Sequence, residues 1–298
     1  MTSIAVIIPA LNAVKTLDGQ LGALANQDGA DPFEVLVCDN GSTDETSKLV
    51  PLWSGRLNVR LVDCSGARGA GYARNCGALA TTAEKLLFCD ADDYVSPNWV
   101  KRMADTLAED GVVVAGPVLR ITEETPLWYI PVNGLNLSNC DENYPYMNYL
   151  PCILAGSLGI RRRDFLAVGG FDNSYGAGCE DVDFSWRAQL HGLQVRVARE
   201  SVLYYRPRTG MGHRFRQARG YTCASILLWQ RFRDQPGIAG KSLSWTLMAL
   251  TSALARTPLQ FFATQKSREE WAAEVGSHLG SLEGHVRFRG SLPPRRAL

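Results

Sequence analysis

The sequence predicts an α/β fold built on an open, mostly parallel sheet flanked by helices. Apolar, strand-like runs alternate with helical stretches through the first 120 residues, which is the rhythm of β-α-β units. Several of these runs are apolar throughout, as in parallel strands that helices cover on both faces. The chain has 298 residues, of which 46% are hydrophobic, and it can bury the core of one large domain or two small ones.

Each element of the first part has its own signal. Residues 4–9 form an apolar strand, and Asn12 is expected to cap a helix that turns Leu17, Leu21 and Leu24 inward. Residues 33–38 and 57–62 are further apolar strands, and the Ala-rich residues 69–80 are typical of a helix. A strand at 85–89, a helix at 98–109 and a strand at 112–118 complete the pattern.

The later part is less regular. Residues 123–151 hold four prolines and five Trp or Tyr side chains; we expect a loop that either stacks on an acceptor or plugs the sheet. A strand at 153–160, a short helix after Arg163, a Gly169-Gly170 break, a helix from near Glu180 and a helix at 216–233 follow. Residues 242–255 are too short and too rich in Ser and Thr to span a membrane, and a core helix is favoured over one lying on a membrane surface.

The net charge of +1 hides an asymmetry. Residues 196–298 carry 17 Lys and Arg against 6 Asp and Glu, so the part before them is acidic. An acidic part can bind a metal cation, and a basic part can meet phosphates or an anionic membrane surface, whereas nucleic acid is not indicated. The eight cysteines form no C-x-x-C pair and the start has no signal peptide, so we expect a cytoplasmic protein without disulfides or zinc.

Two acidic turns follow apolar strands. Asp90-Ala91-Asp92-Asp93 puts three carboxylates in four residues, which favours a Mg²⁺ or Mn²⁺ site over a solvated turn that caps the next helix. The segment from Asp39 to Asp44 ends the second strand. Its Asp39 could accept the imide N–H of a pyrimidine base, and the alternative is an ordinary turn around Gly41.

A glycine-rich segment precedes the third helical stretch. In Gly69-Ala70-Gly71-Tyr72-Ala73-Arg74-Asn75, backbone N–H groups could approach an anion, with Arg68 and Arg74 adding charge. The alternative is that the small residues serve close helix packing.

Two further clusters carry chemistry. Glu180 and Asp181 lie in the first turn of a helix, where the dipole favours the ionised carboxylate that a general base needs, although acidic first turns are common. The Arg-rich run 206–216 resembles a mobile phosphate-binding loop. Its His213 either completes the metal site or is a structural or solvent-facing side chain.

The ordered set of these motifs resembles the family-two inverting glycosyltransferases of GT-A fold, which use nucleotide-sugar donors. The matched segments are residues 6–12, 39–44, 71–77, 88–94, 169–172 and 180–187. The resemblance implies a transferase domain at 1–215, with a nucleotide-sugar-binding half at 1–119 and an acceptor-binding, catalytic half at 120–215. Residues 216–298 would form a basic helical extension.

The resemblance also implies roles for single residues. Asp181 would be the catalytic base and Glu180 would orient the loop or the acceptor. The donor would contact residues at the ends of three strands and in the glycine-rich segment: Pro9, Ala10, Asn12, Asp39, Asn40, Arg68, Arg74, Asp90 and Ala91. Asp92, with His213, would hold Mn²⁺ or Mg²⁺.

The expected reaction is transfer of one hexose from a UDP- or dTDP-sugar to an acceptor hydroxyl, with inversion. The acceptor would be a small molecule, a glycan or a lipid-linked molecule, and the oligomeric state, a homodimer included, is open. The Gln-x-x-Arg-Trp motif of polymer synthases has only a distant echo at residues 217–221, which favours a single addition.

The alternatives are a nucleotidyltransferase, which normally has a glycine-rich loop after its first strand, and a catalytically dead nucleotide-binding scaffold. A third, a dinucleotide-dependent oxidoreductase, lacks its glycine fingerprint.

Overall fold

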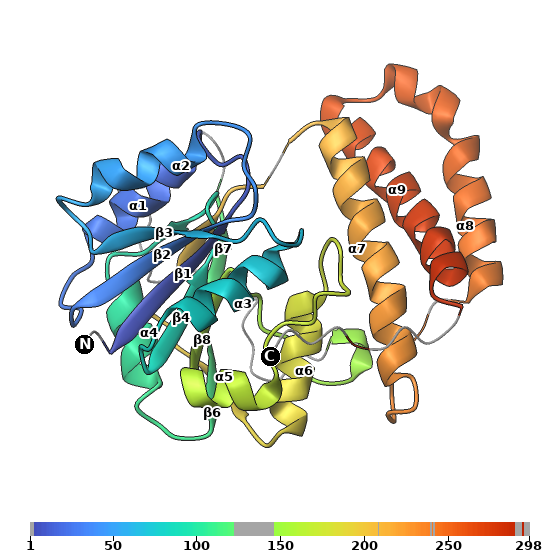
Figure 1. Cartoon of the computed structure of the whole chain (residues 1–298). Helices are drawn as coiled ribbons and strands as arrows, with labels where there is room; N and C mark the ends of the chain where they lie inside the picture. Colours follow the sequence, from blue (N-terminus) through green and yellow to red (C-terminus); the bar gives the residue numbers. More distant parts are fainter. Residues whose placement is uncertain are drawn as a thin grey trace.

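The computed structural model describes residues 3–121, 146–207, 209–238, 240, 242–289 and 294. Its centre is a seven-stranded sheet that helices flank, and a group of long helices lies beside it (Figure 1). The strand order is β3 (Val59–Asp63), β2 (Phe33–Asp39), β1 (Ile4–Ala10), β4 (Lys85–Cys89), β8 (Ser157–Arg161), β6 (Val112–Ala115) and β9 (Gln194–Val197). Only β8 is antiparallel to its neighbours, so the predicted mostly parallel sheet is confirmed.

Side chains of β1 alternate between two apolar layers because successive residues of a strand point to opposite faces. Ile4, Val6 and Ile8 pack in one core with α1 (Leu17–Ala25) and α4 (Trp99–Thr106). Ala5 and Ile7 lie in the other core, with α3 (Ala70–Ala80), α5 (Arg162–Val168) and α6 (Glu180–Leu190). Both faces are covered, which is why these strands are apolar throughout.

A small second sheet lies next to the carboxyl ends of the central strands. It joins β5 (Tyr94–Val95), β10 (Leu203–Tyr205) and β7 (Val118–Arg120). The single strand expected at 112–118 was wrong: Gly116 and Pro117 interrupt it, and β6 and β7 belong to different sheets. Short helical segments α2 (Thr46–Leu49), η1 (Val50–Trp53) and η2 (Tyr146–Asn148) complete the connections.

Three helices form the C-terminal part: α7 (Met211–Phe232), α8 (Leu243–Ala255) and α9 (Gln265–Arg287), with η3 (Thr257–Phe262) between the last two. Figure 1 shows α9 between α7 and α8, on the far side of α7 from the sheet. The expected boundary after residue 215 falls inside α7, and the division into domains stays a prediction. Within the described chain, no helix is long and apolar enough to cross a membrane.

Three local expectations were wrong. Asn12 does not cap a helix: its backbone is left-handed with φ 53°, and α1 begins only at Leu17. The strand expected at 153–160 is shorter, Ser157–Arg161. The helix expected in the core at 242–255 forms at Leu243–Ala255 but exposes most of its large apolar side chains.

Candidate active site

The carboxyl ends of β1, β2 and β4 meet at one edge of the sheet. Ala10 pairs in register with Asp39, and β4 lies on the other side of β1, so the turn that begins at Asp90 belongs to the same edge. The expected donor-binding residues Pro9, Ala10, Asp39 and Asp90 are thereby brought together. Parallel α/β sheets bind ligands at this edge.

Hydrogen bonds tie the loop after β1 to the turn after β2. The Asn12 N–H donates to Ser42 Oγ at 2.9 Å, and Asn12 Oδ1 accepts from the Thr43 N–H at 2.8 Å. Asp39 Oδ1 accepts from the Ser42 N–H at 2.9 Å, which leaves its second oxygen for a ligand. The left-handed backbone of Asn12, unusual for a residue other than glycine, is held by these bonds. The two loops therefore form one rigid wall.

The side chain of Asn40, expected to bind the donor, serves the backbone. Its amide nitrogen donates to the carbonyl oxygens of Cys64 and Ala67, at 2.6 and 2.7 Å, and its Oδ1 accepts from the Gly69 N–H at 2.8 Å. Asn40 is buried and fully bonded, so its role is to fix the loop that carries Arg68. Arg68 itself is exposed on that loop.

Arg74 connects the two halves of the site. Its guanidinium donates to Asp90 Oδ1 at 2.6 Å and to Glu180 Oε1 at 3.1 Å, and only 4% of the side chain is exposed. Burial alone would lower the pKa of this guanidinium, but the carboxylates of Asp90 and Glu180 outweigh burial and raise it. Arg74 thus stays charged and links the end of β4 to the start of α6.

Asp181 lies beside this ion-pair cluster, in the first turn of α6. Burial of its carboxylate, then the neighbouring Glu180, raises its pKa to about 7, although Arg74 acts in the opposite direction. Its oxygens accept weakly from Ala155, at 3.5 Å, and from Val182. The helix dipole was expected to keep this group ionised, and burial and Glu180 prove stronger. A carboxylate with a pKa near 7 can take or give a proton at neutral pH.

The turn after β4 contributes Asp92, which is half-buried. Its neighbours Ala91 and Asp93 are buried, and Ala91 packs in the core, so any ligand contact of Ala91 is through its backbone. No group of three His, Cys, Asp or Glu side chains able to hold a metal occurs among the residues the structure describes, so Asp92 and His213 are not joined in such a group. His213 is exposed in the first turn of α7.

This donor set fits one kind of metal binding. Mg²⁺ and similar hard cations are often held by one or two carboxylates together with oxygens of the substrate's phosphates. Because Asp90 is already paired with Arg74, Asp92 is the carboxylate that would hold Mg²⁺ or Mn²⁺.

Several buried polar residues that sequence reasoning missed hold the site in place. Gln20 donates to the Asp90 carbonyl and accepts from the Val95 N–H, which fixes the acidic turn. Asn75 bonds both the N–H and the carbonyl of Phe171, which joins α3 to the Gly169-Gly170 segment. A polar residue at a position that the helical period places inside was the only signal for them.

The acidic residues around α6 divide into two roles. Asp172 accepts from Arg231 at 2.8 Å and Asp183 from Arg187 at 2.7 Å, and both carboxylates are buried. The first pair anchors the loop 172–179 to α7, and the Tyr175 hydroxyl, which donates to Asp183 at 3.2 Å, anchors the loop to α6. Immediately before Glu180, Gly178 and Cys179 both have positive φ, 111° and 65°. This sharp turn into α6 places Glu180 and Asp181 at the edge of the sheet, whereas Asp172 and Asp183 are held by arginines.

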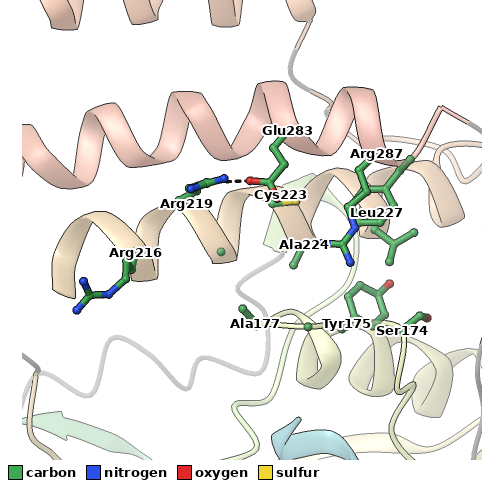
Figure 2. A pocket seen from close by; sticks show the side chains of 13 residues that line it. Ser174, Tyr175, Ala177, Arg216, Arg219, Cys223, Ala224, Leu227, Glu283 and Arg287 are labelled. Carbon is green, nitrogen blue, oxygen red and sulfur yellow. Dashed lines mark hydrogen bonds and ion pairs between the residues drawn. The ribbon is translucent and has the colours of Figure 1, made fainter. Parts of the chain in front are cut away.

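A pocket of about 360 Å³ opens between the loop 174–177 and the facing surfaces of α7 and α9 (Figure 2). Its wall includes Tyr175 and Leu227, and the positive charge comes from Arg216, Arg219 and Arg287. Arg219 is paired with Glu283 at 2.8 Å. Tyr221 lies near the middle of α7. The pKa of its phenol is raised, first by partial burial, then by Tyr205 and by the negative charges of Asp181 and Glu180, which lie close to it. The middle of α7 therefore borders the candidate base.

Part of the expected acceptor region lies outside the described residues. These are residues 122–145, with Trp128, Tyr129 and Tyr144, and Arg208 in the Arg-rich run. Of the aromatic side chains that remain, Tyr149 packs edge-on against Trp186, with ring centroids 5.1 Å apart.

Comparison with known proteins identifies relatives for the chain. The validoxylamine A glucosyltransferase of Streptomyces hygroscopicus subsp. jinggangensis is 31% identical over 229 residues, 66% of this chain and 54% of the relative. The chain thus spans about half the length of that curated relative.

Solved structures share the fold at lower identity. The mannosyltransferase PcManGT of Pyrobaculum calidifontis, in complex with GDP-Man and Mn²⁺, superposes with a TM-score of 0.60 at 19% identity, covering 91% of this chain and 86% of that one. Residues 1–349 of S. aureus TarS, in complex with UDP-GlcNAc, give 0.51 at 20% identity, covering 96% and 92%.

Family models identify the chain most directly. One described as the N-terminal domain of galactosyltransferase matches residues 131–209. Another, described as glycosyl transferase family 2, matches residues 5–169, more than half of the chain. The sheet with ligand-binding strand ends, the ordered motifs and this match agree: the chain belongs to glycosyl transferase family 2 and has the GT-A fold.

Proposed function

We propose that the chain transfers one hexose from a UDP- or dTDP-sugar to an acceptor hydroxyl with inversion, and that Asp181 is the general base. One observation carries the proposal. Arg74 joins Asp90, at the end of β4, to Glu180, at the start of α6, so that Asp181, with a pKa of about 7, stands at the ligand-binding edge of the sheet.

The donor would bind across the ends of β1, β2 and β4. The oxygen of Asp39 that Ser42 leaves open would accept the imide N–H, which uracil and thymine share. Solved structures of similar fold bind different nucleotide sugars, UDP-GlcNAc in one and GDP-Man in another, so the base preference rests on Asp39. Mn²⁺ accompanies GDP-Man in the second structure.

In the proposed step, the acceptor oxygen forms a bond to the anomeric carbon while the bond from that carbon to the diphosphate oxygen breaks. The acceptor proton passes to an Asp181 carboxylate oxygen, which must be ionised beforehand. The nucleoside diphosphate leaves with the bonding electron pair and one more negative charge. A divalent cation held by Asp92, when bound, would neutralise that charge. Glu180 and Arg74 position the base and do not exchange protons in this scheme.

The acceptor would approach from the side of α7. The charge effect of Asp181 on Tyr221 supports this side, and the pocket bordered by Arg216 and Arg287 lies on it. A negatively charged or polyhydroxylated acceptor suits that lining.

The experiment combines donor binding with turnover. Thermal shift would be measured with nucleoside diphosphates and nucleotide sugars, with and without Mn²⁺, and nucleoside diphosphate release would be followed with a panel of saccharides and validoxylamine A. We expect Asp181→Asn to keep the donor-induced shift and to lose transfer, while Asp105→Asn, an exposed carboxylate on α4, retains both. Retained transfer in Asp181→Asn would remove Asp181 as base. Donor binding without turnover for any acceptor would support the dead scaffold instead.

A further inference from the structure

Helix α8 exposes large apolar side chains and buries a polar one, which is the reverse of an ordinary surface helix. It packs on α9 through Thr246, Leu250 and Ala253, and Thr246 is fully buried with its hydroxyl 3.1 Å from Ser281 Oγ. The side away from α9 carries large apolar side chains, of which Met248 is 64% exposed and Leu247 49%. Surface helices normally bury such side chains and present polar ones to water.

The exposed apolar side chains continue into η3. Phe262 is 94% exposed and Leu259 64%. We call this set the α8–η3 surface; it consists of Leu243, Trp245, Leu247, Met248, Leu254, Leu259 and Phe262. Figure 1 shows α8 at the outer edge of the molecule, on the far side of the helical group from the sheet. Apolar side chains gathered in this way mark a binding surface, since scattered ones would need no explanation.

The charges nearest the surface in the sequence are basic. Residues 235–268 contain four basic residues and no acidic one, and α8 itself carries no charge. Acidic residues begin with Glu269 and Glu270 of α9, where Glu269 accepts from the Gly210 N–H and Glu274 pairs with Arg256. Arg268 Nε donates to the Ala263 carbonyl at 3.1 Å, which holds this guanidinium next to Phe262. Lys266 is exposed, and Arg256, which follows α8, is 46% exposed although it pairs with Glu274 of α9.

We propose that the α8–η3 surface docks on an anionic lipid bilayer. A helix with an uncharged apolar face and basic flanks lies in the plane of the interface, with its apolar side chains at the acyl boundary and its basic groups among the headgroups. Trp245, at the margin of the surface where its ring packs against His278 of α9, suits that depth because its ring is apolar and its N–H is polar. A second copy of this chain is the alternative occupant, and the test below separates it from the bilayer.

The test uses the full chain and vesicles of two compositions, phosphatidylcholine alone and equal parts of phosphatidylcholine and phosphatidylglycerol. We expect sedimentation with the anionic vesicles, weakened by salt. The double variant Met248→Ser, Phe262→Ser should bind them at least tenfold more weakly, because two large apolar side chains would no longer be moved out of water on binding. Leu52→Ser is the matched control, since Leu52 is 76% exposed on η1, away from this surface, and should bind as wild type does.

Both changed side chains are exposed, so the double variant should fold, and an unchanged melting temperature verifies that. Equal binding of the double variant and the control would overturn the proposal. So would a lack of vesicle binding together with a concentration-dependent dimer that the double variant abolishes, which would make a second copy the occupant. Because vesicle binding is read without donor or acceptor, this outcome is independent of the proposed transferase activity.

Discussion

At the scale of single residues, the candidate site depends on how charge is distributed among Arg74, Asp90, Glu180 and Asp181. Three carboxylates face one buried guanidinium, and two of them bond it directly. The carboxylate of Asp181 is affected instead by burial and by the negative charge of Glu180, and both raise its pKa, to about 7. The cluster thus separates carboxylates that position from one that can exchange a proton.

The pH dependence of transfer follows from this pKa. The base must be ionised, so we expect the transfer rate to fall as pH drops below about 7 and to level off above it. A pH–rate profile of kcat/KM, which reports the titrating groups of the free enzyme, checks this. A profile that stays flat from pH 5 to pH 8 would contradict the assignment of Asp181.

The ionised carboxylate of Asp181 should also lower the free energy of unfolding at neutral and higher pH. Its raised pKa means that the folded state binds more protons than the unfolded state between the ordinary aspartate pKa of 3.8 and about 7. The free energy of unfolding therefore falls as pH rises through that window, and the loss is complete above it. We expect Asp181→Asn to melt at a higher temperature than wild type at pH 8, and the advantage to shrink toward pH 4. A lower melting temperature at pH 8 would contradict this reasoning.

Arg74 should tolerate no replacement. Removing one partner of a buried ion pair costs ~3–5 kcal/mol, and since Asp90 is a third exposed we expect the lower end of that range for Arg74→Ala. Arg74→Lys keeps the charge but lacks the planar fork that reaches Asp90 and Glu180 together. Arg74→Lys should lower both the urea midpoint of unfolding and the donor-induced thermal shift, whereas Arg163→Lys, at a position on α5 that is 62% exposed, should lower neither.

At the scale of elements, α9 approaches α7 through glycines spaced four residues apart. A Cβ at Gly276 would lie 2.4 Å from the Phe215 carbonyl oxygen, and one at Gly280 would lie 2.1 Å from that of Arg219. These backbone atoms cannot move aside as a side chain could. The contact fixes α7, and with it Arg219 and Tyr221, next to the candidate base.

We expect Gly280→Ala to destabilise the protein by about 1–3 kcal/mol, the usual cost of overpacking a well-fitted contact. It should also impair acceptor use more than donor binding, because α7 and α9 line the pocket and the donor residues lie elsewhere. Gly55→Ala is the control, since a Cβ there would meet nothing within 4 Å. Equal unfolding midpoints in urea for the two variants would show that the helices can separate at no cost.

At the scale of the whole molecule, donor and cation should stabilise the fold together. A nucleotide sugar at a hundred times its Kd adds ~2.7 kcal/mol to the free energy of unfolding. We expect Mn²⁺ to enlarge the donor-induced shift of the melting temperature, EDTA to reverse that enlargement, and Asp92→Asn to abolish it. A donor-induced shift that EDTA leaves unchanged would remove Asp92 from the proposed metal site. His213→Ala, in an exposed position, should leave the metal effect intact.

Local patterns were sufficient for the sheet and for its ligand-binding edge. Apolar runs with both faces buried identified β1, β2 and β4 nearly to the residue, because the interior of a parallel strand between two helical layers is almost wholly apolar. The acidic turns and the Glu180-Asp181 pair were visible for the same reason, as polar residues directly after apolar ones. The ordered motifs then predicted the family that the comparisons confirm.

Only the tertiary structure decided which polar groups are already bonded to one another. Asn40 was expected at the donor, and its amide instead ties together residues 64, 67 and 69; Asp172 is anchored by Arg231 of α7. It also decided that Leu247 and Met248 face outward while Thr246 faces α9. A sequence records the period of a helix but not which face finds a partner. Partners are chosen by contacts between residues far apart in the chain, so the chain's own order determines the elements, and packing determines what each side chain is free to do.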